Sequence, residues 1–307
     1  MEWQKKGLVY VPDGKRSWAR GTAYLPTVDI LNSKVLRVYF ASLDENKYGR
    51  IGYVDLDIDN PQRILKESPE PVLDLGEYGT FDDCGVSPCC ILNIQGKKYL
   101  YYFGWQRCSR VPYMLFAGLA AAGTDGCFHR VSRVPVLDRT SKEPFVRSAI
   151  SVIEESGMFQ AWYVSARQWI NIGNTLYPSY VIRYADSHDG IKWNDYDHIC
   201  IDFESEDEFG FGRPWVVKEK SLYRMWYSIR SRSKPYRIGY AESGDGVSWQ
   251  RKDQEAGIEK SASGWDSEMI CFPCVVRIGG LEYMFYNGNQ HGASGFGYAV
   301  REQCLCS

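Results

Sequence analysis

Residues 184–193 read YADSHDGIKW, and residues 240–249 read YAESGDGVSW. In both stretches an Asp-Gly pair lies between two runs of strand-forming residues. Asp-Gly in that place is a strong hairpin signal, because glycine adopts a positive φ at little cost. A weaker copy, TDGCF, occupies residues 124–128. The repeated hairpin motif predicts a chain built from similar β units.

Two further marks recur with one period. A short aromatic run ends at Phe40, Phe103, Tyr163, Tyr227 and Tyr286, at spacings of 63, 60, 64 and 59 residues. The head of the preceding strand carries Pro26, Pro88, Pro214 and Pro273, with Ile150 in the middle place, at spacings of 62, 62, 64 and 59 residues. Because the marks are independent, they support a repeat of about sixty residues.

Each period has room for four strands: an inner strand opened by proline, the aromatic strand, a Gly-Tyr strand, and a last strand after the turn. Five periods predict an all-β fold, a five-bladed β-propeller of four-stranded antiparallel blades. We expect a single domain over residues 1–307, with blades at approximately 20–80, 81–145, 146–208, 209–265 and 266–301. The fifth repeat lacks room for a fourth strand, so the N-terminal strand 7–12 should complete it and close the ring.

Composition argues against several classes of partner. The formal net charge is −2 with 24% charged residues, which indicates neither nucleic-acid nor membrane-surface binding. No apolar run is long enough to span a membrane. The first seven residues are polar and lack a signal-peptide core, which predicts a cytoplasmic protein.

The ten cysteines are expected to be reduced thiols in that compartment. CFPC at residues 271–274 has the CxxC form, but no second pair lies nearby, so no metal site is predicted. No cofactor is expected. An axial Ca²⁺ stays an open alternative, because oxygen ligands leave no distinct spacing in a sequence.

Strand order predicts which loops share a face. The loops before the inner strands and the loops after the aromatic strands should lie together, on a side that we call the mouth face. The Asp-Gly turns should lie on the opposite face and be structural. Loops on a rigid scaffold commonly carry function, which directs attention to the mouth face.

Arginines gather in these loops. The set comprises Arg20, Arg107, Arg147, Arg167, Arg213, Arg230 and Arg232. Since the guanidinium fork matches carboxylate and phosphate, the set favours an anionic ligand. The alternative is that these arginines pair with Asp82, Asp83, Glu208, Asp266 or Glu268 and tie blades together.

The repeated decapeptides, the proline-headed inner strands and the period of about sixty residues resemble the five-bladed glycosidase propellers. This superfamily holds glycoside hydrolase families 32, 43, 62, 68 and 130, and the resemblance covers nearly the whole chain. It implies a funnel-shaped sugar site on the axis. Carboxylates from different blades act as acid and as base or nucleophile in the hydrolases, whereas family 130 phosphorylases use one acid and a basic phosphate site.

The chain departs from this family at the inner strands. The hydrolases often place Asp directly before the proline, but the residues there are Leu25, Ser87, Arg213 and Phe272, and the third inner strand has no proline. The family's catalytic residues therefore cannot be transferred one by one. By position, Asp82 or Asp83 of the second blade and Asp266 or Glu268 of the fifth remain.

A glycosidase needs two carboxyl groups, about 5 Å apart for retention or roughly 6.5–9.5 Å apart for inversion. We assign Asp83 as the candidate base or nucleophile and Glu268 as the candidate acid. Alternatively, Asp82 caps its turn and Glu268 pairs with Arg20 or Arg213.

Candidate substrate-binding residues complete the predicted site. Arg147 and Arg213 would bind an anionic group, and Arg20, Arg167 and Arg230 belong to the same cationic set. Trp105 and Trp169 would stack on sugar rings, and Asn287 and His291 would bind hydroxyl groups. Both tryptophans could instead be packing residues.

Three functions are compatible with these residues. The first is a glycoside hydrolase or phosphorylase that acts on an anionic or phosphate-bearing small molecule or oligosaccharide. The second is glycosyl transfer from an activated sugar in surface-polysaccharide synthesis. The third is a non-catalytic glycan-binding or scaffolding propeller, which the missing pre-proline Asp favours.

Overall fold

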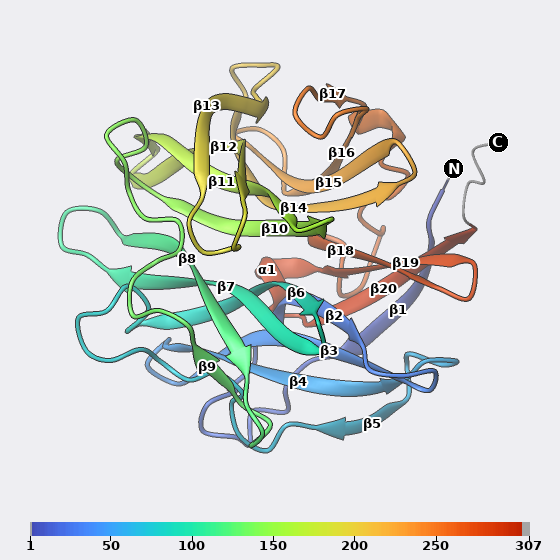
Figure 1. Ribbon diagram of the computed structural model, residues 1–307. Helices are drawn as coiled ribbons and strands as arrows, with labels where there is room; N and C mark the ends of the chain where they lie inside the picture. The colour runs from blue at the N-terminus through green and yellow to red at the C-terminus, as the bar shows by residue number, and fades with distance from the viewer. Residues whose placement is uncertain (1, 303–307) are drawn as a thin grey trace.

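β-Strands make up most of the chain, as Figure 1 shows for the computed structural model. The structure describes residues 2–302, so Cys304 and Cys306 lie outside the described part. The two helical segments in that part are short: η1 (Asp253–Glu255) and α1 (Asn289–Gly292), whose Gln290 and His291 have left-handed backbone angles. The all-β prediction is therefore confirmed.

The first four units each contain four antiparallel strands in chain order. Unit I holds β2 (Tyr24–Ile30), β3 (Val35–Leu43), β4 (Gly49–Asp57) and β5 (Ile64–Glu67). Unit II holds β6 (Gly85–Ile94), β7 (Lys97–Arg107), β8 (Tyr113–Ala122) and β9 (Phe128–Arg130). Unit III holds β10 (Arg147–Glu155), β11 (Met158–Ile172), β12 (Thr175–Ser187) and β13 (Asn194–Ile201). Unit IV holds β14 (Glu208–Glu219), β15 (Leu222–Ser231), β16 (Arg237–Ser243) and β17 (Gln250–Arg251).

Unit V takes strands from both ends of the chain. It contains β18 (Cys271–Ile278), β19 (Leu281–Asn287) and β20 (Phe296–Glu302), and β1 (Gln4–Tyr10) pairs antiparallel with β20. The N-terminal strand thus begins at residue 4 rather than at the predicted residue 7. Trp3 also links the N-terminal segment to the end of unit IV, because its indole Nε1 donates to the carbonyl of Ala256, just after η1, at 3.0 Å.

The first strands of the five units contact one another in cyclic order. β2 contacts β6 and β18, β10 contacts β6 and β14, and β14 contacts β18. Figure 1 shows these strands gathered near the middle of the molecule, with the later strands of each unit farther out. Side chains from the five first strands therefore meet around one centre.

A β-bulge interrupts every first strand near its head. The register breaks between Tyr24 and Thr27, Pro88 and Cys90, Ser148 and Ser151, Gly212 and Trp215, and Cys271 and Cys274. In four units the bulged segment holds a non-glycine residue at positive φ: Leu25 at 60°, Ala149 at 42°, Arg213 at 43° and Phe272 at 56°. Because such backbone is unfavourable for L-residues, its recurrence marks a position that the fold requires.

The second repeat must be shifted by one residue from the predicted alignment. Cys90 pairs with Tyr101 as Ser151 pairs with Trp162, so Cys89, not Pro88, matches Ile150. The residue at the strained position of unit II is therefore Pro88, not Ser87. Proline cannot adopt a positive φ, which explains why unit II alone lacks the left-handed residue.

The Asp-Gly turns join neighbouring units. The Gly190 carbonyl accepts a hydrogen bond from the Tyr101 hydroxyl of unit II at 2.8 Å. The Gly246 carbonyl accepts one from Trp162 Nε1 of unit III at 2.7 Å. These contacts give the turns the structural role that the strand order predicts.

We predict that Asp245→Asn destabilises the fold in a pH-dependent manner. Backbone N–H groups of Ser248 and Val247 donate to Asp245 Oδ1 at 2.7 and 2.8 Å and lower its pKa to about 2. The loss should be about 1 kcal/mol near pH 6. A lowered pKa stabilises the fold above the unfolded-state value of about 3.9, and that contribution disappears as the pH falls toward about 2.

Urea denaturation at about pH 6 and about pH 3 measures this difference. Asp59→Asn is the control, because the exposed Asp59 side chain has no hydrogen bond or ion pair within residues 2–302. An equal difference between wild type and Asp245→Asn at both pH values would contradict the prediction.

Candidate functional site

The two predicted loop sets meet on the mouth face in every unit. Backbone hydrogen bonds join the segment before each first strand to the end of the second strand. They run from Arg20 N to Leu43 O, Cys84 N to Trp105 O, Ala166 N to Val146 O, Arg232 N to Asp207 O, and Asn289 N to Trp265 O. The mouth face is therefore built from paired loops of all five units.

Aromatic side chains surround the centre of this face. We call them, with two polar neighbours, the mouth cluster. Its members are Tyr24, Ser87, Trp105, Tyr113, Trp169, Tyr177, Arg230, Tyr236, Phe272 and His291. Most are only partly buried, so they offer surface to a ligand.

Ring contacts link the members across units. The Tyr236 and His291 ring centroids lie 4.6 Å apart in an edge-on arrangement, and Phe272 lies 6.3 Å from His291. Trp169 of unit III lies 5.9 Å from Tyr113 of unit II. Aromatic residues of units II to V thus form a continuous part of the rim.

Arg230 lies in a cage of four aromatic rings. Its guanidinium carbon is 4.7 Å from the ring centre of Phe209 and 5.3, 5.4 and 5.7 Å from those of Tyr177, Tyr180 and Tyr236. The side chain comes from the end of β15 and is only 6% exposed. Such a cage holds the cation by its attraction to the ring faces.

No carboxylate within residues 2–302 forms an ion pair with Arg230. Its Nε–H and the buried Tyr180 hydroxyl have no hydrogen-bond partner in that part of the chain. A buried cation without a counter-charge is costly, by several kcal/mol. The cage is therefore suited to an anion from outside the chain.

His291 lies beside this cation. Although part of its side chain reaches solvent, the surrounding protein and then the charge of Arg230 lower the pKa of its imidazole. His291 is therefore neutral near pH 7, with a ring nitrogen available to accept or donate a hydrogen bond.

The strained positions at the heads of the five first strands form the floor of the mouth, and none of these described residues is a carboxylate. The strained positions of the five first strands carry Leu25, Pro88, Ala149, Arg213 and Phe272. Arg213 is 2% exposed and donates to oxygens of units I, II and V. The pre-proline acids that the resemblance implies are therefore replaced here by apolar residues and one cation.

Asp82 and Asp266 are buried in matching hydrogen-bond networks. Asp82 accepts from the Tyr102 hydroxyl at 2.9 Å and pairs with Arg130 at 2.7 Å. Asp266 accepts from the Tyr286 hydroxyl at 2.9 Å and pairs with Lys5 at 2.6 Å. Since Asp82 accepts hydrogen bonds at both oxygens and Asp266 accepts two at Oδ2, we propose a structural role for them rather than the candidate catalytic one.

The Asp83 and Glu268 side chains have fewer hydrogen-bond and ion-pair partners than those of Asp82 and Asp266. Asp83 Oδ2 accepts from the Gly79 N–H at 2.9 Å, while its buried Oδ1 has no partner among the described residues. Glu268 is exposed, and its backbone N–H donates to Asn289 Oδ1 at 2.7 Å. Their assignment as base and acid stays a prediction.

Several predicted binding residues instead contact protein groups. Arg20 donates to the Gly14 carbonyl, Arg167 pairs with Asp202 at 2.5 Å, and Arg147 pairs with the buried Glu143 at 3.2 Å. Asn287 is fully buried. Its Oδ1 accepts from the Leu25 N–H and its amide donates to the Ala23 and Gly295 carbonyls, so it joins unit V to unit I.

Trp105, Trp169, Arg230 and His291 are the predicted binding residues that the structure brings to the mouth cluster. Trp105 packs on Gly85 and Gly49, where a Cβ atom on Gly85 would lie 2.0 Å from the indole nitrogen. The sequence pattern does not single out Tyr113, Tyr177 and Tyr236. Tyr113 begins β8, Tyr177 is the third residue of β12 and Tyr236 directly precedes β16, so extending each predicted loop to the first residues of the third strand would have included them.

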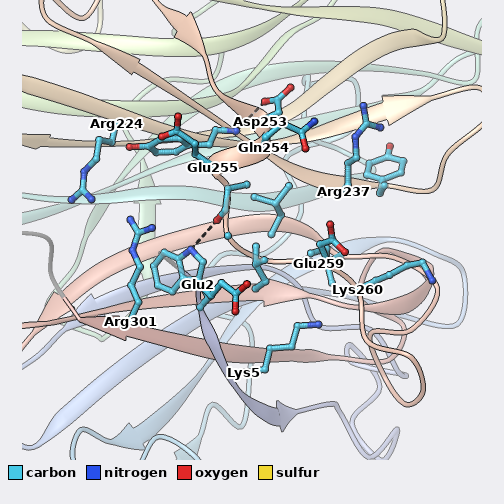
Figure 2. Close-up of a pocket in the computed structure, with 18 of the residues that line it drawn as sticks. Glu2, Lys5, Arg224, Arg237, Asp253, Gln254, Glu255, Glu259, Lys260 and Arg301 are labelled. Atoms are coloured by element: carbon cyan, nitrogen blue, oxygen red, sulfur yellow. Dashed lines mark hydrogen bonds between the residues drawn. The ribbon is translucent and has the colours of Figure 1, made fainter.

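A separate cleft of about 1010 Å³ lies between units IV and V. Figure 2 shows its charged side chains converging from β15, β16, the η1 segment and the N-terminus. Its arginines are already paired: Arg224 and Arg301 with Glu282 at 2.5 and 2.8 Å, and Arg237 with Glu208 at 3.3 Å. Within residues 2–302 the cleft therefore offers an anion no arginine without an ion pair, whereas the mouth cluster offers Arg230.

Two curated proteins are similar to the chain over its length. The uncharacterized protein Rv1502 of Mycobacterium tuberculosis strain H37Rv is 37% identical over 302 residues, which cover 98% of this chain and 100% of that protein. The uncharacterized protein MT1551 of strain CDC 1551 has the same identity and coverage. The chain belongs to their family. No family model matches it.

Solved structures similar to this Rv1502-family chain are carbohydrate-active proteins. A glycoside hydrolase has a TM-score of 0.74 at 18% identity, covering 97% of this chain and 90% of its own. A member of the GH130 family, described among mannoside phosphorylases and hydrolases of β-1,2 mannosidic linkages in Candida mannan, has a TM-score of 0.71 at 14% identity, covering 98% and 93%. A thermostable family-43 glycoside hydrolase has 0.66 at 15% identity, covering 94% and 91%. The chain thus has a propeller-glycosidase-like fold.

Two features are absent from residues 2–302. No group of three or more His, Cys, Asp or Glu side chains is placed to hold a metal ion. No helix in this range is long and apolar enough to cross a membrane.

We predict that the neighbouring substitutions Asp82→Asn and Asp83→Asn lower stability to very different extents. Asp82→Asn removes the buried carboxylate charge that pairs with the partly exposed Arg130, and should cost about 3 kcal/mol because the buried ion pair is broken. Asp83→Asn keeps an oxygen for Gly79 N–H and should change stability by about 0.5 kcal/mol or less. Urea denaturation of both variants measures the difference. Equal losses would contradict the assignment of Asp82 to structure.

Proposed function

We propose that the chain is a carbohydrate-active enzyme whose mouth cluster binds an anionic or phosphate-bearing sugar. The supporting observation is Arg230, a nearly buried guanidinium in an aromatic cage without a carboxylate partner in the described chain. The glycoside hydrolase and GH130 folds among its structural neighbours support carbohydrate chemistry.

The proposal includes the arrangement of the five units. We take the five units as five blades of one propeller domain over residues 1–307, closed by β1. The cyclic contacts of the first strands and the pairing of β1 with β20 support this reading. In such a ring the mouth cluster lies over the axis, where side chains of all blades can reach one ligand.

Electrostatics favours a negative ligand group. Arg213 in the floor and Arg230 in the wall lack carboxylate partners within residues 2–302. A carboxylate or phosphate at Arg230 would satisfy its unpartnered N–H and offset the buried charge. The same ligand group could donate to, or accept from, the unpartnered Tyr180 hydroxyl.

The aromatic rim suits the rest of a sugar. Tyr236, Phe272 and Trp169 present partly exposed rings, which can stack on pyranose faces. Neutral His291 can hydrogen-bond a hydroxyl group beside them. Most of the ligand's recognition would therefore come from apolar contact, with orientation set by a few polar groups.

Phosphorolysis needs one acid, whereas hydrolysis needs two carboxyl groups, so the residues of the floor, which include Arg213 and no carboxylate, favour phosphorolysis. In phosphorolysis, orthophosphate held at Arg230 attacks the anomeric carbon while one acid protonates the departing glycosidic oxygen. The C–O bond to the leaving group breaks and a C–O bond to phosphate forms. Glu268 is our candidate acid, and hydrolysis would need Asp83 as base or nucleophile in addition.

A non-catalytic glycan-binding propeller is the second candidate. It is favoured by the floor without a carboxylate and by the ion-paired Asp82 and Asp266. Transfer from an activated sugar would use the same anion contact and would yield a new glycosidic bond in place of a sugar phosphate.

We also propose a reducing, cytosolic location. Within residues 2–302 the eight cysteines are free thiols, five of them buried. Recovery of the native protein from a periplasmic or secreted fraction would overturn this part.

We predict that the protein binds charged sugars more tightly than their neutral counterparts through Arg230. Calorimetric titration with glucuronate, mannose 1-phosphate and inorganic phosphate, against glucose and mannose, measures the preference. Arg230→Gln should weaken anion binding at least tenfold, about 1.4 kcal/mol, and Arg230→Lys should weaken it less. His291 ring resonances should shift on titration of wild type, because the anion offsets the neighbouring charge.

Arg63→Gln is the matched control, since exposed Arg63 lies on the turn between β4 and β5 and its side chain pairs, within residues 2–302, only with Asp57 at 3.4 Å. Equal binding of charged and neutral sugars, or unchanged anion binding by Arg230→Gln, would contradict the proposal.

We predict that Glu268→Gln lowers turnover by a factor of 10² or more, since protonation of the leaving oxygen commonly contributes about that much. Turnover is measured as sugar phosphate formed from oligosaccharides and phosphate, or as reducing sugar formed without phosphate. Asp83→Asn should stop hydrolysis but not phosphorolysis. Glu45→Gln, an exposed mouth-face acid, is the control. Unchanged rates in both Glu268→Gln and Asp83→Asn would favour the binding protein.

A further inference from the structure

Four oxygen atoms converge on the guanidinium of Arg213. Nη1 donates to the Pro26 carbonyl at 2.7 Å and to the Phe272 carbonyl at 3.1 Å. Nη2 donates to Thr27 Oγ1 at 2.7 Å and to the Cys89 carbonyl at 3.3 Å. The acceptors belong to units I, II and V, and Arg213 belongs to unit IV, so four units meet at one side chain.

The bulges explain why these oxygens are available. Pro26, Cys89 and Phe272 lie in the bulged heads of β2, β6 and β18, where the strand ladder is interrupted. Their carbonyl groups accept from Arg213 across the centre rather than only from a neighbouring strand. Arg213 itself lies in the bulge of β14, with φ 43°.

The surroundings give this cation no formal counter-charge. Within residues 2–302 no carboxylate pairs with Arg213, and its Nε–H has no partner. The nearest sulfur groups are neutral thiols, because burial raises the pKa of Cys89 to about 12 and of Cys274 to about 11. Neutral groups therefore stabilise the charge: carbonyl and hydroxyl dipoles, as around hard metal cations, and the Trp215 ring, whose centre lies 5.1 Å from the guanidinium carbon.

We propose that Arg213 is a built-in axial cation: its guanidinium fills the oxygen-lined centre of the five units, in the place where a bound metal ion could act, and fixes the floor of the mouth. The ligand set is three carbonyls and a hydroxyl, and the charge is covalently attached. This inference goes beyond the proposed function and does not depend on the ligand of Arg230.

Removal of the side chain should create a cation site. In Arg213→Ala, four oxygens would face a cavity without charge. A small cation of matching shape should bind there and restore stability, whereas an uncharged molecule of the same shape should not. Binding to the folded state alone raises the unfolding temperature with ligand concentration.

The test is thermal unfolding of Arg213→Ala with low millimolar methylguanidinium, K⁺ or Ca²⁺, and with N-methylurea as the neutral isostere. We expect a lower midpoint than wild type and a saturable recovery with methylguanidinium or one of the metal ions. Wild type and Arg63→Ala should show no such recovery. Equal recovery with N-methylurea, or none with any cation, would overturn the proposal.

A second pair of variants covers the case in which Arg213→Ala does not fold. Arg213→Lys keeps a charge at the centre, and Arg213→Met has a similar length without one. We expect Arg213→Lys to unfold at the higher temperature. An Arg213→Met protein as stable as wild type would show that Arg213 only fills space. Because unfolding is the readout, this result is independent of sugar binding and turnover.

Discussion

The bulge at the head of each first strand is the constraint on which the mouth depends. It interrupts the strand ladder where five strands approach one centre, and it holds Leu25, Ala149, Arg213 and Phe272 at positive φ. The released carbonyl groups need donors, since buried polar groups without partners are costly. Arg213 donates to three of these carbonyls and to the Thr27 hydroxyl, which ties units I, II, IV and V together beneath the ligand face.

The arginines of the mouth face differ in whether a carboxylate of the chain already pairs with them, and this distinguishes structural arginines from one that can bind a ligand. Arg147 is buried against Glu143, and Arg167 pairs with Asp202, so both already have a counter-charge. Arg230 is equally buried but is surrounded by rings and lacks a carboxylate partner in residues 2–302. A count of arginines on one face therefore overstates the charge that a ligand meets.

The repeat in the sequence is sufficient to predict the all-β fold and the use of the N-terminal strand. It is insufficient to align the second unit with the others. Pro88 occupies the strained bulge position there, whereas in units I, IV and V the proline comes one residue after that position. The repeat also cannot distinguish Asp82 from Asp83. Both lie in one mouth-face loop, but only the folded chain shows that Asp82 turns inward to Tyr102. The tyrosines around Arg230 are not predicted from the sequence, because single tyrosines have no distinctive spacing.

We propose above all that Arg230 binds an anion from outside the chain. Diffraction at the selenium edge from crystals soaked in selenate tests it directly, because the anomalous signal locates the anion without prior choice of sugar. The account predicts a peak within about 3 Å of the Arg230 guanidinium nitrogens. A peak only in the cleft between units IV and V, with none at Arg230, would contradict it and direct attention to Arg224 and Arg301.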